Sequence, residues 1–194
     1  MRLIGITGGI GTGKSTVTNY LQTRYHLPIW DADIYAREAV AVGSPILAAI
    51  SQRYGDDILQ PDGTLDRPQL GEIIFNKLEE RQWLEAQIHP YVRGCFDREI
   101  SRIPSDATAV LAIPLLFEAK LTTLVTEIWV VSCDLATQID RVMLRDRLDE
   151  SAARQRIASQ MPLSAKIALA DVNLDNSTTL EDLERQIDSK IALT

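Results

Sequence analysis

Short apolar runs and helix-type periodicities alternate along most of the chain. Apolar runs that end in glycine or acidic residues predict buried strands, and apolar residues three and four positions apart predict amphipathic helices. Strands are expected at 2–7, 27–33, 109–118 (together with its following loop), 127–133 and 170–177. Helices are expected at 14–25, 33–42, 134–160 and 179–193, the last opened by a capping box of Thr178 and Glu181. Such alternation predicts a parallel sheet covered by helices.

One long stretch interrupts this alternation. Ser44 and Pro45 supply an N-cap and a proline in the first turn, which predicts a helix. The pattern is helical again over 65–89, and a further helix is expected over 90–103. The sequence therefore predicts an α/β core formed by residues 1–43 and 105–194, with a helical insertion at 44–104.

Composition narrows the classes of function. The 194 residues are 45% hydrophobic and 24% charged, with a formal net charge of −7, which disfavours a protein whose main work is to bind nucleic acid backbones. The longest apolar run, 109–117, is too short to span a membrane, and the first residues lack the pattern of a secretory signal. A cytoplasmic location follows, and Cys95 and Cys133 are expected to be ordinary buried thiols.

The richest chemical signal is GGIGTGKST, residues 8–16, between the first strand and the first helix. Gly8, Gly13, Lys14 and Ser15 match G-x-x-x-x-G-K-[ST] at every fixed position. Glycines let backbone amides face a phosphate, the lysine reaches the β- and γ-phosphates, and the serine hydroxyl is a magnesium ligand. Gly9, Gly11, Thr12 and Thr16 complete the expected ATP site. A chance glycine turn is the alternative.

Among phosphate-loop proteins, a small kinase fits best, because the sequence lacks the base-reading and D-x-x-G motifs of a GTP switch. Asp31 and Asp33 follow the second strand, whose carboxyl end should lie beside the loop in a parallel sheet. If that segment is extended, both carboxylates face the site, where one can take a proton from a hydroxyl and the other can order magnesium-bound water. Capping of the next helix is the competing interpretation of both residues.

An arginine-rich helical region at 138–160 resembles a mobile lid. Arg141 and Arg145 are one turn apart, so they share a face that a phosphate chain would neutralise. Interleaved acidic residues leave open an ordinary ion-paired surface helix. His89, near the end of the insertion's main helix, and Glu118, after a core strand, have equally ordinary structural interpretations; Glu118 lies where it would contact a metal or orient a substrate-binding residue.

Together these segments resemble the dephospho-CoA kinase family. The resemblance covers residue 3 to about residue 185, and it rests on ITGGIGTGKST, WDADIYAREAV, IHPYVR, IPLLFEAKL, ATQIDRVMLRD, RIASQMPLSAK and ADVNLDNS occurring in the family's order and spacing. It implies a three-layer P-loop kinase fold with a nucleotide-binding core, a helical acceptor domain and a lid. It also implies transfer of the γ-phosphoryl group of ATP, with Mg²⁺, to the ribose 3′-hydroxyl of dephospho-CoA.

The resemblance further implies roles for single residues. Asp33 would be the general base, Lys14 and Ser15 would serve the phosphates and magnesium, and Asn176 would lie close to the adenine. Acceptor-side positions would be Asp31, Asp33, His89, Arg93 and Glu118, and Arg141 and Arg145 would belong to the lid. Thr12 stands where serine is common, and the residues after Asn176 depart from the glycine that many members have.

Two rival functions stay open at this stage. One is a kinase for another small hydroxyl compound, such as a nucleotide or a sugar acid; the other is a regulatory protein that binds a nucleotide without transferring phosphate. The expected partner is a small-molecule substrate rather than a nucleic acid or a membrane, and the chain is expected to be a monomer or a weak homo-oligomer.

Overall fold

The computed structural model describes residues 1–192, and these form two compact units. One unit combines residues 1–31 with the chain from 104 onward, and the other comprises residues 32–103. The first unit contains the strands β1 (Arg2–Gly8), β2 (Ile29–Asp31), β3 (Thr108–Ala112), β4 (Glu127–Ser132) and β5 (Val172–Asp175). Its helices are α1 (Lys14–Tyr25), α6 (Leu135–Asp146), α7 (Glu150–Ala158), α8 (Leu163–Ala168) and α9 (Leu180–Ile191).

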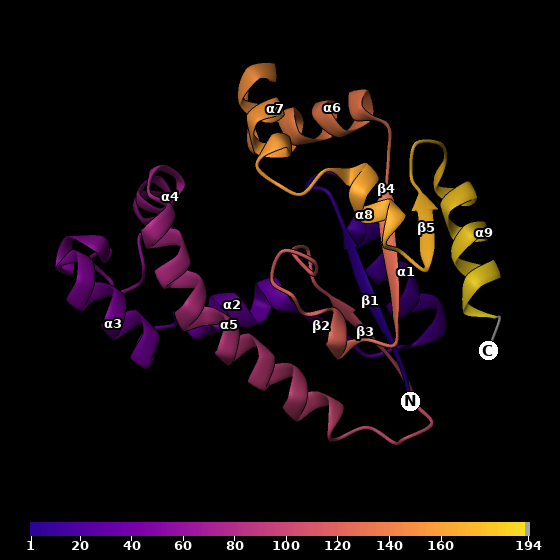
Figure 1. The fold of residues 1–194 in the computed structure, drawn as a ribbon, viewed down its shortest axis with the longest axis horizontal. Helices are drawn as coiled ribbons and strands as arrows, with labels where there is room; N and C mark the ends of the chain where they lie inside the picture. The colour runs from indigo at the N-terminus through magenta and orange to yellow at the C-terminus, as the bar shows by residue number, and fades with distance from the viewer. Residues whose placement is uncertain (193–194) are drawn as a thin grey trace. The chain divides into compact units, whose positions relative to one another are not determined.

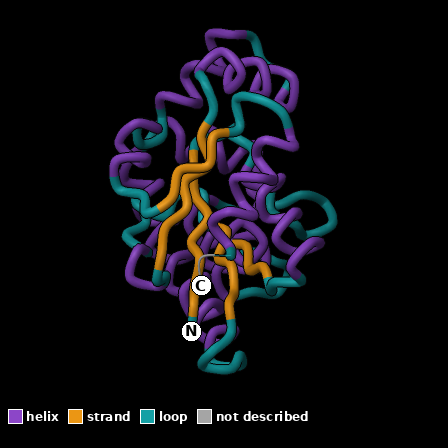
Figure 2. The backbone as a smooth tube through the Cα atoms, turned by 90° about the vertical axis from the view of Figure 1, so that its right-hand side faces the viewer, coloured by secondary structure: helices purple, strands orange, loops and turns teal. Residues whose placement is uncertain are grey.

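The five strands form one sheet in the order β2-β3-β1-β4-β5, and every neighbouring pair is parallel. The orange strands of Figure 2 accordingly run side by side. Because all strands point the same way, their carboxyl ends share one edge, and the loop after β1 lies at that edge. The prediction of a parallel sheet covered by helices is confirmed.

One face of the sheet packs against α1 and α9. Ile4 and Ile6 alternate with residues of the opposite face, and they join Leu21 of α1 and Ile187 of α9 in a cluster whose buried members are fully shielded from solvent. Asp188 of α9 accepts hydrogen bonds from the hydroxyls of Tyr20 (2.9 Å) and Tyr25 (2.7 Å). The hydrogen bond from Tyr25 to Asp188, with burial, raises the pKa of Tyr25 to about 12. The two helices that flank the nucleotide loop's strand are thus fixed to each other.

The opposite face is covered by the loop after β3 and by α8. A Cβ on Gly5 would come 3.0 Å from Val125 and 3.3 Å from Leu116, so this loop packs directly on the strand. Thr7 donates to the carbonyl of Pro114 (3.1 Å), and the same carbonyl accepts from Lys166 of α8 (3.2 Å). The end of β1 is therefore anchored on this face to the loop after β3.

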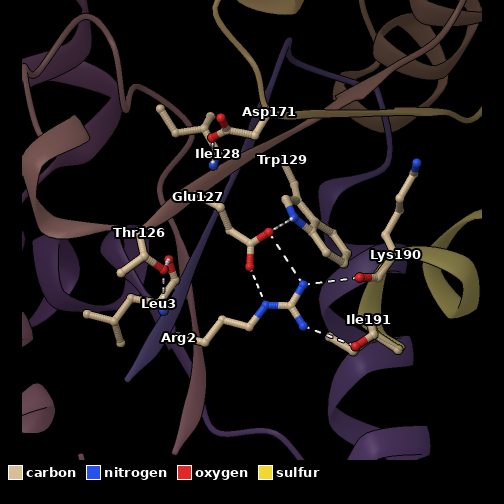
Figure 3. Close-up of polar contacts among 9 residues, drawn as sticks. All are labelled: Arg2, Leu3, Thr126, Glu127, Ile128, Trp129, Asp171, Lys190 and Ile191. Atoms are coloured by element: carbon tan, nitrogen blue, oxygen red, sulfur yellow. Dashed lines mark hydrogen bonds and ion pairs between the residues drawn. The ribbon is translucent and has the colours of Figure 1, made fainter. Parts of the chain in front are cut away.

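Arg2 joins the amino-terminal edge of the sheet to the end of α9. Figure 3 shows its guanidinium between the Glu127 carboxylate and the carbonyls of Lys190 (3.1 Å) and Ile191 (3.0 Å). A cation at the last carbonyls of a helix also complements the helix dipole. Glu127 additionally accepts from the indole of Trp129 (3.0 Å). This cluster lies at the end of the strands opposite the nucleotide loop.

The second unit is helical and has its own core. It contains α2 (Ala32–Ala39), α3 (Pro45–Tyr54), α4 (Arg67–Asn76) and α5 (Leu78–Ile100), labelled in Figure 1. Helix α2 packs on α5, where the rings of Tyr35 and Phe96 meet edge to face at 5.3 Å. A second apolar cluster joins α3, α4 and α5 around Ile50 and Leu70. Ser44 caps α3 by accepting from the amide of Leu47, as the sequence predicted.

Three predicted helix limits are wrong. The separate helices expected over 65–89 and 90–103 are divided elsewhere: α4 ends at Asn76, and α5 runs through Pro90, which removes only one backbone bond from a long, well-packed helix. The helix expected over 134–160 breaks where Arg147 adopts a left-handed conformation. The last helix is capped by Thr179, whose side chain accepts from the amide of Asp182, rather than by Thr178 with Glu181.

The chain divides into these units at a different residue from the expected domain limit. The sequence placed residues up to 43 in the core, whereas α2 belongs to the compact helical unit, which begins at Ala32. The functional division into core, acceptor insertion and lid stays a prediction, and the expected end of the last helix at residue 193 lies outside the described residues. Among the residues that are described, no helix combines the length and apolar character needed to cross a membrane.

Candidate functional site

The loop between β1 and α1 has the backbone conformation of a phosphate loop. Gly11 (φ 76°) and Gly13 (φ 99°) lie in the left-handed region, which costs glycine little and other residues much. A side chain at Gly13 would also overlap Asn176, because its Cβ would lie 2.1 Å from Nδ2. Helix α1 begins at Lys14, directly after this glycine, so its positive dipole end opens into the loop.

The donors expected for a phosphate converge at this loop. The Lys14 ammonium donates to the carbonyls of Gly8 (3.2 Å) and Gly9 (2.7 Å) and so lies across the loop. Within the part of the chain that the structure describes, the amides of Gly11 and Gly13 donate to no protein acceptor. A backbone amide left without a partner is an available donor, so the loop offers a cation and amides to an anion.

Ser15 and Thr16 occupy the first turn of α1, and Ser15 is exposed. No group of three or more histidine, cysteine, aspartate or glutamate residues capable of holding a metal occurs among the described residues. Magnesium bound with nucleotide phosphates needs few protein ligands and keeps several waters. The exposed Ser15 hydroxyl beside the loop therefore fits a magnesium ion that is shared with phosphate oxygens.

Asn176 and Thr12 hold the loop from within. The buried Asn176 amide donates to the carbonyl of Thr12 (2.8 Å), and the fully buried Thr12 hydroxyl donates to the carbonyl of Gly9 (2.9 Å). The resemblance placed Asn176 close to an adenine; its side chain contacts the loop backbone here. Both residues shape the loop, and Thr12 does so through the hydroxyl it shares with serine.

Arg141 of α6, one of the two arginines expected in a lid, lies against the loop. Its Nη2 donates to the carbonyl of Asn176 (3.2 Å), and its Cβ would lie 3.7 Å from a Cβ on Gly11. Its Nη1 is buried and has no hydrogen-bond partner among the described residues. No carboxylate forms an ion pair with it in this part of the chain. Arg141 is thus an uncompensated cation beside the phosphate loop.

The other arginines of α6 and α7 are already paired. Asp146 forms ion pairs with Arg145 (2.8 Å) and Arg156 (2.8 Å), and Arg154 forms one with Glu150 (2.6 Å). The hydrogen bond from Arg145 lowers the pKa of Asp146. These three arginines therefore belong to an ordinary ion-paired helix surface, whereas Arg141 fits the hypothesis of an arginine that binds a phosphate chain.

Asp31 and Asp33 lie in different elements. Asp31 ends β2 on the same sheet edge as the loop, but β3 stands between β2 and β1, so its strand end is not the loop's immediate neighbour. Asp33 lies in the first turn of α2. The expectation that the extended segment continues to Asp33 is wrong, because the chain becomes helical at Ala32; that both carboxylates face the site stays a prediction. The assignment of Asp33 as base stays a prediction, and its position also suits the positive end of α2.

Glu118 ties two loops together. Its Oε1 accepts from Lys166 (2.9 Å) and from the amide of Met161 (3.1 Å), and Lys166 is fully buried. Burial acts to raise the pKa of Glu118, but the hydrogen bonds from Lys166 and the backbone outweigh it and lower the pKa. Oε2 is buried without a hydrogen-bond partner in the described part of the chain. The charge of Glu118 is therefore neutralised by Lys166, while Oε2 can still accept a hydrogen bond.

His89 and Arg93 lie one turn apart on α5, in the helical unit. His89 is partly buried and Arg93 is exposed. Neither side chain forms a hydrogen bond or ion pair with the other described residues. Their i, i+4 spacing puts an imidazole and a guanidinium on one helix face, which suits an anionic acceptor.

Three residues in contact with this site were not assigned a role from the sequence. Gln138 and Gln160 hydrogen-bond to Ile10 of the loop, at 2.8 Å and 2.9 Å, and Lys166 holds Glu118. Gln160 and Lys166 both belong to the RIASQMPLSAK segment that carried the resemblance. Nothing in their local sequence shows that Gln160 contacts the loop or that Lys166 contacts Glu118, since both contacts join residues far apart in the sequence.

Comparison with known proteins adds a family to this geometry. The family model for dephospho-CoA kinase matches residues 2–182. A dephospho-CoA kinase of Synechocystis sp. is 59% identical over 186 residues, covering 96% of this chain and 92% of the relative.

Solved structures show the same fold over the whole chain. The crystal structure of TT1252 from Thermus thermophilus has a TM-score of 0.84 and 34% identity, covering 100% of this chain and 98% of that one. A dephospho-CoA kinase from Campylobacter jejuni has a TM-score of 0.70 and 26% identity, covering 98% and 96% of the two chains. The expected P-loop kinase fold is thereby confirmed.

Proposed function

The chain belongs to the dephospho-CoA kinase family, and we propose that it transfers the γ-phosphoryl group of ATP to the ribose 3′-hydroxyl of dephospho-CoA. The products are coenzyme A and ADP, so the reaction is the last step of coenzyme A biosynthesis. The observation that carries this proposal is the family match over residues 2–182. The loop alone supports only a nucleotide phosphate, because many kinases share it.

The donor half of the reaction rests on Lys14 and the loop amides. On ATP binding, the Lys14 ammonium exchanges the carbonyls of Gly8 and Gly9 for β- and γ-phosphate oxygens, while the amides of Gly11 and Gly13 donate to the same chain. Each of these groups carries a charge or dipole fixed in place before the reaction begins. Such pre-oriented groups stabilise the charge that develops on the transferred phosphoryl group.

Ser15 would hold magnesium together with the phosphates. A magnesium ion bound there would neutralise negative charge on the β- and γ-phosphates. Thr16, one residue further in the same first turn, supports the phosphate end of the site.

On the acceptor side, Asp33 accepts the proton of the 3′-hydroxyl as that oxygen attacks phosphorus. Asp31, His89, Arg93 and Glu118 complete the acceptor site in this proposal. A base of this kind contributes mainly by positioning the hydroxyl, because phosphoryl transfer proceeds through a loose transition state.

Arg141 and Arg145 serve as lid residues with unequal parts. Arg141 already faces the loop without a carboxylate partner, so it neutralises the phosphate chain directly. Arg145 must first release Asp146 to do the same. Closure of residues 138–160 over the donor would exclude water, which otherwise competes with the 3′-hydroxyl for the phosphoryl group.

The setting of the reaction follows from its chemistry. The partner is the small-molecule substrate dephospho-CoA, with ATP and Mg²⁺. We propose a cytoplasmic enzyme that acts as a monomer or weak homo-oligomer and binds neither nucleic acid nor membranes, in keeping with its net charge of −7.

A coupled ADP assay across several acceptors tests the proposal. We expect magnesium-dependent ADP release with dephospho-CoA and a product phosphorylated at the ribose 3′-oxygen, identified by mass spectrometry and phosphorus NMR. Lys14→Ala serves as the inactive control, since it removes the cation at the phosphates. A preference for a sugar acid or a nucleoside monophosphate would make this another kinase. ATP binding without ADP release on any acceptor would indicate a regulatory protein.

A further inference from the structure

Two glutamines outside the loop hold both polar groups of a single loop residue. The Ile10 amide donates to Oε1 of Gln160 at 2.9 Å, and the Ile10 carbonyl accepts from Nε2 of Gln138 at 2.8 Å. Gln138 lies on α6 and is 3% exposed, and Gln160 follows α7 and is partly buried. No role has been assigned to either glutamine so far in the phosphate site.

The first of these bonds fixes the peptide between Gly9 and Ile10. In a planar trans peptide, the N–H and C=O point in opposite directions. With the Ile10 amide held by Gln160, the Gly9 carbonyl is directed the other way, to the Lys14 ammonium at 2.7 Å and the Thr12 hydroxyl at 2.9 Å. Gln160 therefore determines where the carbonyl that holds Lys14 lies.

The second bond fixes the next peptide, between Ile10 and Gly11. The Ile10 carbonyl points at Gln138, so the Gly11 amide points away from it. This amide is among the loop amides that donate to no acceptor within the described residues. Gln138 thereby sets the direction of a donor available to a phosphate.

Gln138 and α6 lie directly against the loop glycines. A Cβ on Gly9 would lie 2.6 Å from Nε2 of Gln138, and one on Gly11 would lie 2.9 Å from Val142 of α6. The Ile10 side chain packs against the apolar cluster of α6 and α7 that contains Ile139, Val142 and Ala153. Ile10 thus connects the loop to the segment of α6 and α7 through both its backbone and its side chain.

From these contacts we infer that Gln138 and Gln160 are positioning residues for the donor nucleotide. They orient two consecutive peptides of the loop and couple the lid helices α6 and α7 to the phosphate chain. They touch no reacting atom, and their effect reaches the phosphates through Lys14 and the Gly11 amide. The inference rests on the proposed function only as far as nucleotide binding.

Gln160→Leu tests the inference, because leucine keeps the size of the side chain and removes the acceptor. Dissociation constants for ATP and for inorganic tripolyphosphate are measured by calorimetry, and Michaelis constants for ATP and dephospho-CoA by the ADP assay. We expect about a three- to tenfold weaker binding of both phosphate ligands, the effect of one lost hydrogen bond, with the Michaelis constant for dephospho-CoA unchanged. The matched control is Gln155→Leu, which changes an exposed glutamine of α7.

Gln138→Leu and the double variant complete the test. Because both glutamines hold the same residue, the combined loss is expected to be smaller than the product of the single losses. Wild-type affinity for tripolyphosphate in Gln160→Leu would overturn the inference, as would equal losses for ATP and dephospho-CoA, which indicate a general loss of structure. Should Gln138→Leu fail to fold, Gln160→Leu decides alone.

The two proposals fail in different ways. Tripolyphosphate binding is independent of the acceptor, so it reports on the glutamines even if dephospho-CoA is not phosphorylated. If Gln160→Leu binds tripolyphosphate like the wild type and turns over dephospho-CoA normally, only the positioning role of Gln138 and Gln160 is overturned.

Discussion

At the scale of single residues, the arginines of α6 and α7 differ in what already neutralises their charge. Arg145, Arg154 and Arg156 each pair with a carboxylate, whereas Arg141 donates to a carbonyl and has a buried Nη1 for which the described residues supply no hydrogen-bond partner. Their spacing in the sequence predicted that Arg141 and Arg145 lie on one helix face. It did not show which of the two forms an ion pair with a neighbouring acidic residue. That depends on side-chain geometry around Asp146, to which Arg156 also contributes.

Arg141→Ala should lower kcat/KM for ATP by at least about tenfold, because it removes a fixed cation beside the phosphate chain. Steady-state kinetics with varied ATP measures the effect. Arg154→Ala is the matched control, since Arg154 is exposed and already paired with Glu150, and it should behave like the wild type. Equal activity of the two variants would remove Arg141 from the donor site.

Asp33→Asn should keep ATP binding and lose most of its turnover. The amide retains the size of the carboxylate but cannot take the hydroxyl proton, and loss of a general base costs about 10²- to 10⁴-fold in rate. Calorimetric ATP binding and the ADP assay separate the two effects. Turnover close to that of the wild type would show that Asp33 is not the base and would favour its helix-capping interpretation.

At the scale of elements, Glu118 and Lys166 connect the loop after β3 with α8. This brace joins residues far apart in the sequence, so neither local pattern nor spacing predicts it. Glu118 was predicted only as a carboxylate near the catalytic edge, with its contacts open. The structure gives it a fully buried ammonium as partner, which the hydrophobic pattern of α8 does not suggest.

The lowered pKa of Glu118 predicts a pH-dependent contribution to stability. The folded state favours the ionised carboxylate, so this stability is present above the ordinary glutamate pKa of about 4.3 and is lost as the pH falls through the lower pKa of the folded state. Glu118→Gln should cost about 2 kcal/mol near neutral pH, because it leaves the buried Lys166 with a weaker partner.

Thermal or urea unfolding at several pH values measures this contribution. The difference between wild type and Glu118→Gln should shrink on acidification below about pH 4. Glu150→Gln, which removes an exposed ion pair on α7, should cost less than about 0.5 kcal/mol at every pH. A difference for Glu118→Gln that stays constant from neutral to acidic pH would contradict the assigned ionisation.

The predicted elements succeeded where the signal is local. Gly13, Lys14 and the apolar run of β1 locate the strand, the loop and the start of α1 without tertiary information. One helix break was predicted where none exists, and another break was missed. Pro90 ordinarily disrupts a helix but is tolerated within α5, and Arg147 carries no local stop signal yet adopts the left-handed conformation that ends α6.

At the scale of the whole molecule, the sheet order could not be read from the sequence. Strand β3 is inserted between β1 and β2 after more than seventy intervening residues, and only long-range pairing decides that. The same non-local pairing brings Asn176, Arg141, Gln138 and Gln160 to a loop near residue 10. The motif of the donor site and Arg141 were therefore predictable from the sequence, and Asn176 was named through the resemblance, whereas the contacts of Gln138 and Gln160 with the loop were not predictable.

The acceptor side depends on a different kind of knowledge. His89, Arg93 and Asp33 belong to the helical unit, and their assignment to dephospho-CoA follows from family membership. The chemistry of these residues suits an anionic alcohol but does not by itself select a ribose. The identity of the reacting hydroxyl is thus the central claim to be tested.

Turnover of magnesium-ATP with dephospho-CoA, compared with its 3′-deoxy analogue, tests that claim most directly. We expect stoichiometric ADP and coenzyme A from dephospho-CoA, and no ADP above the acceptor-free rate from the analogue, which should compete for the acceptor site. Equal ADP release from the two compounds would show that the phosphoryl group goes elsewhere and would contradict the account.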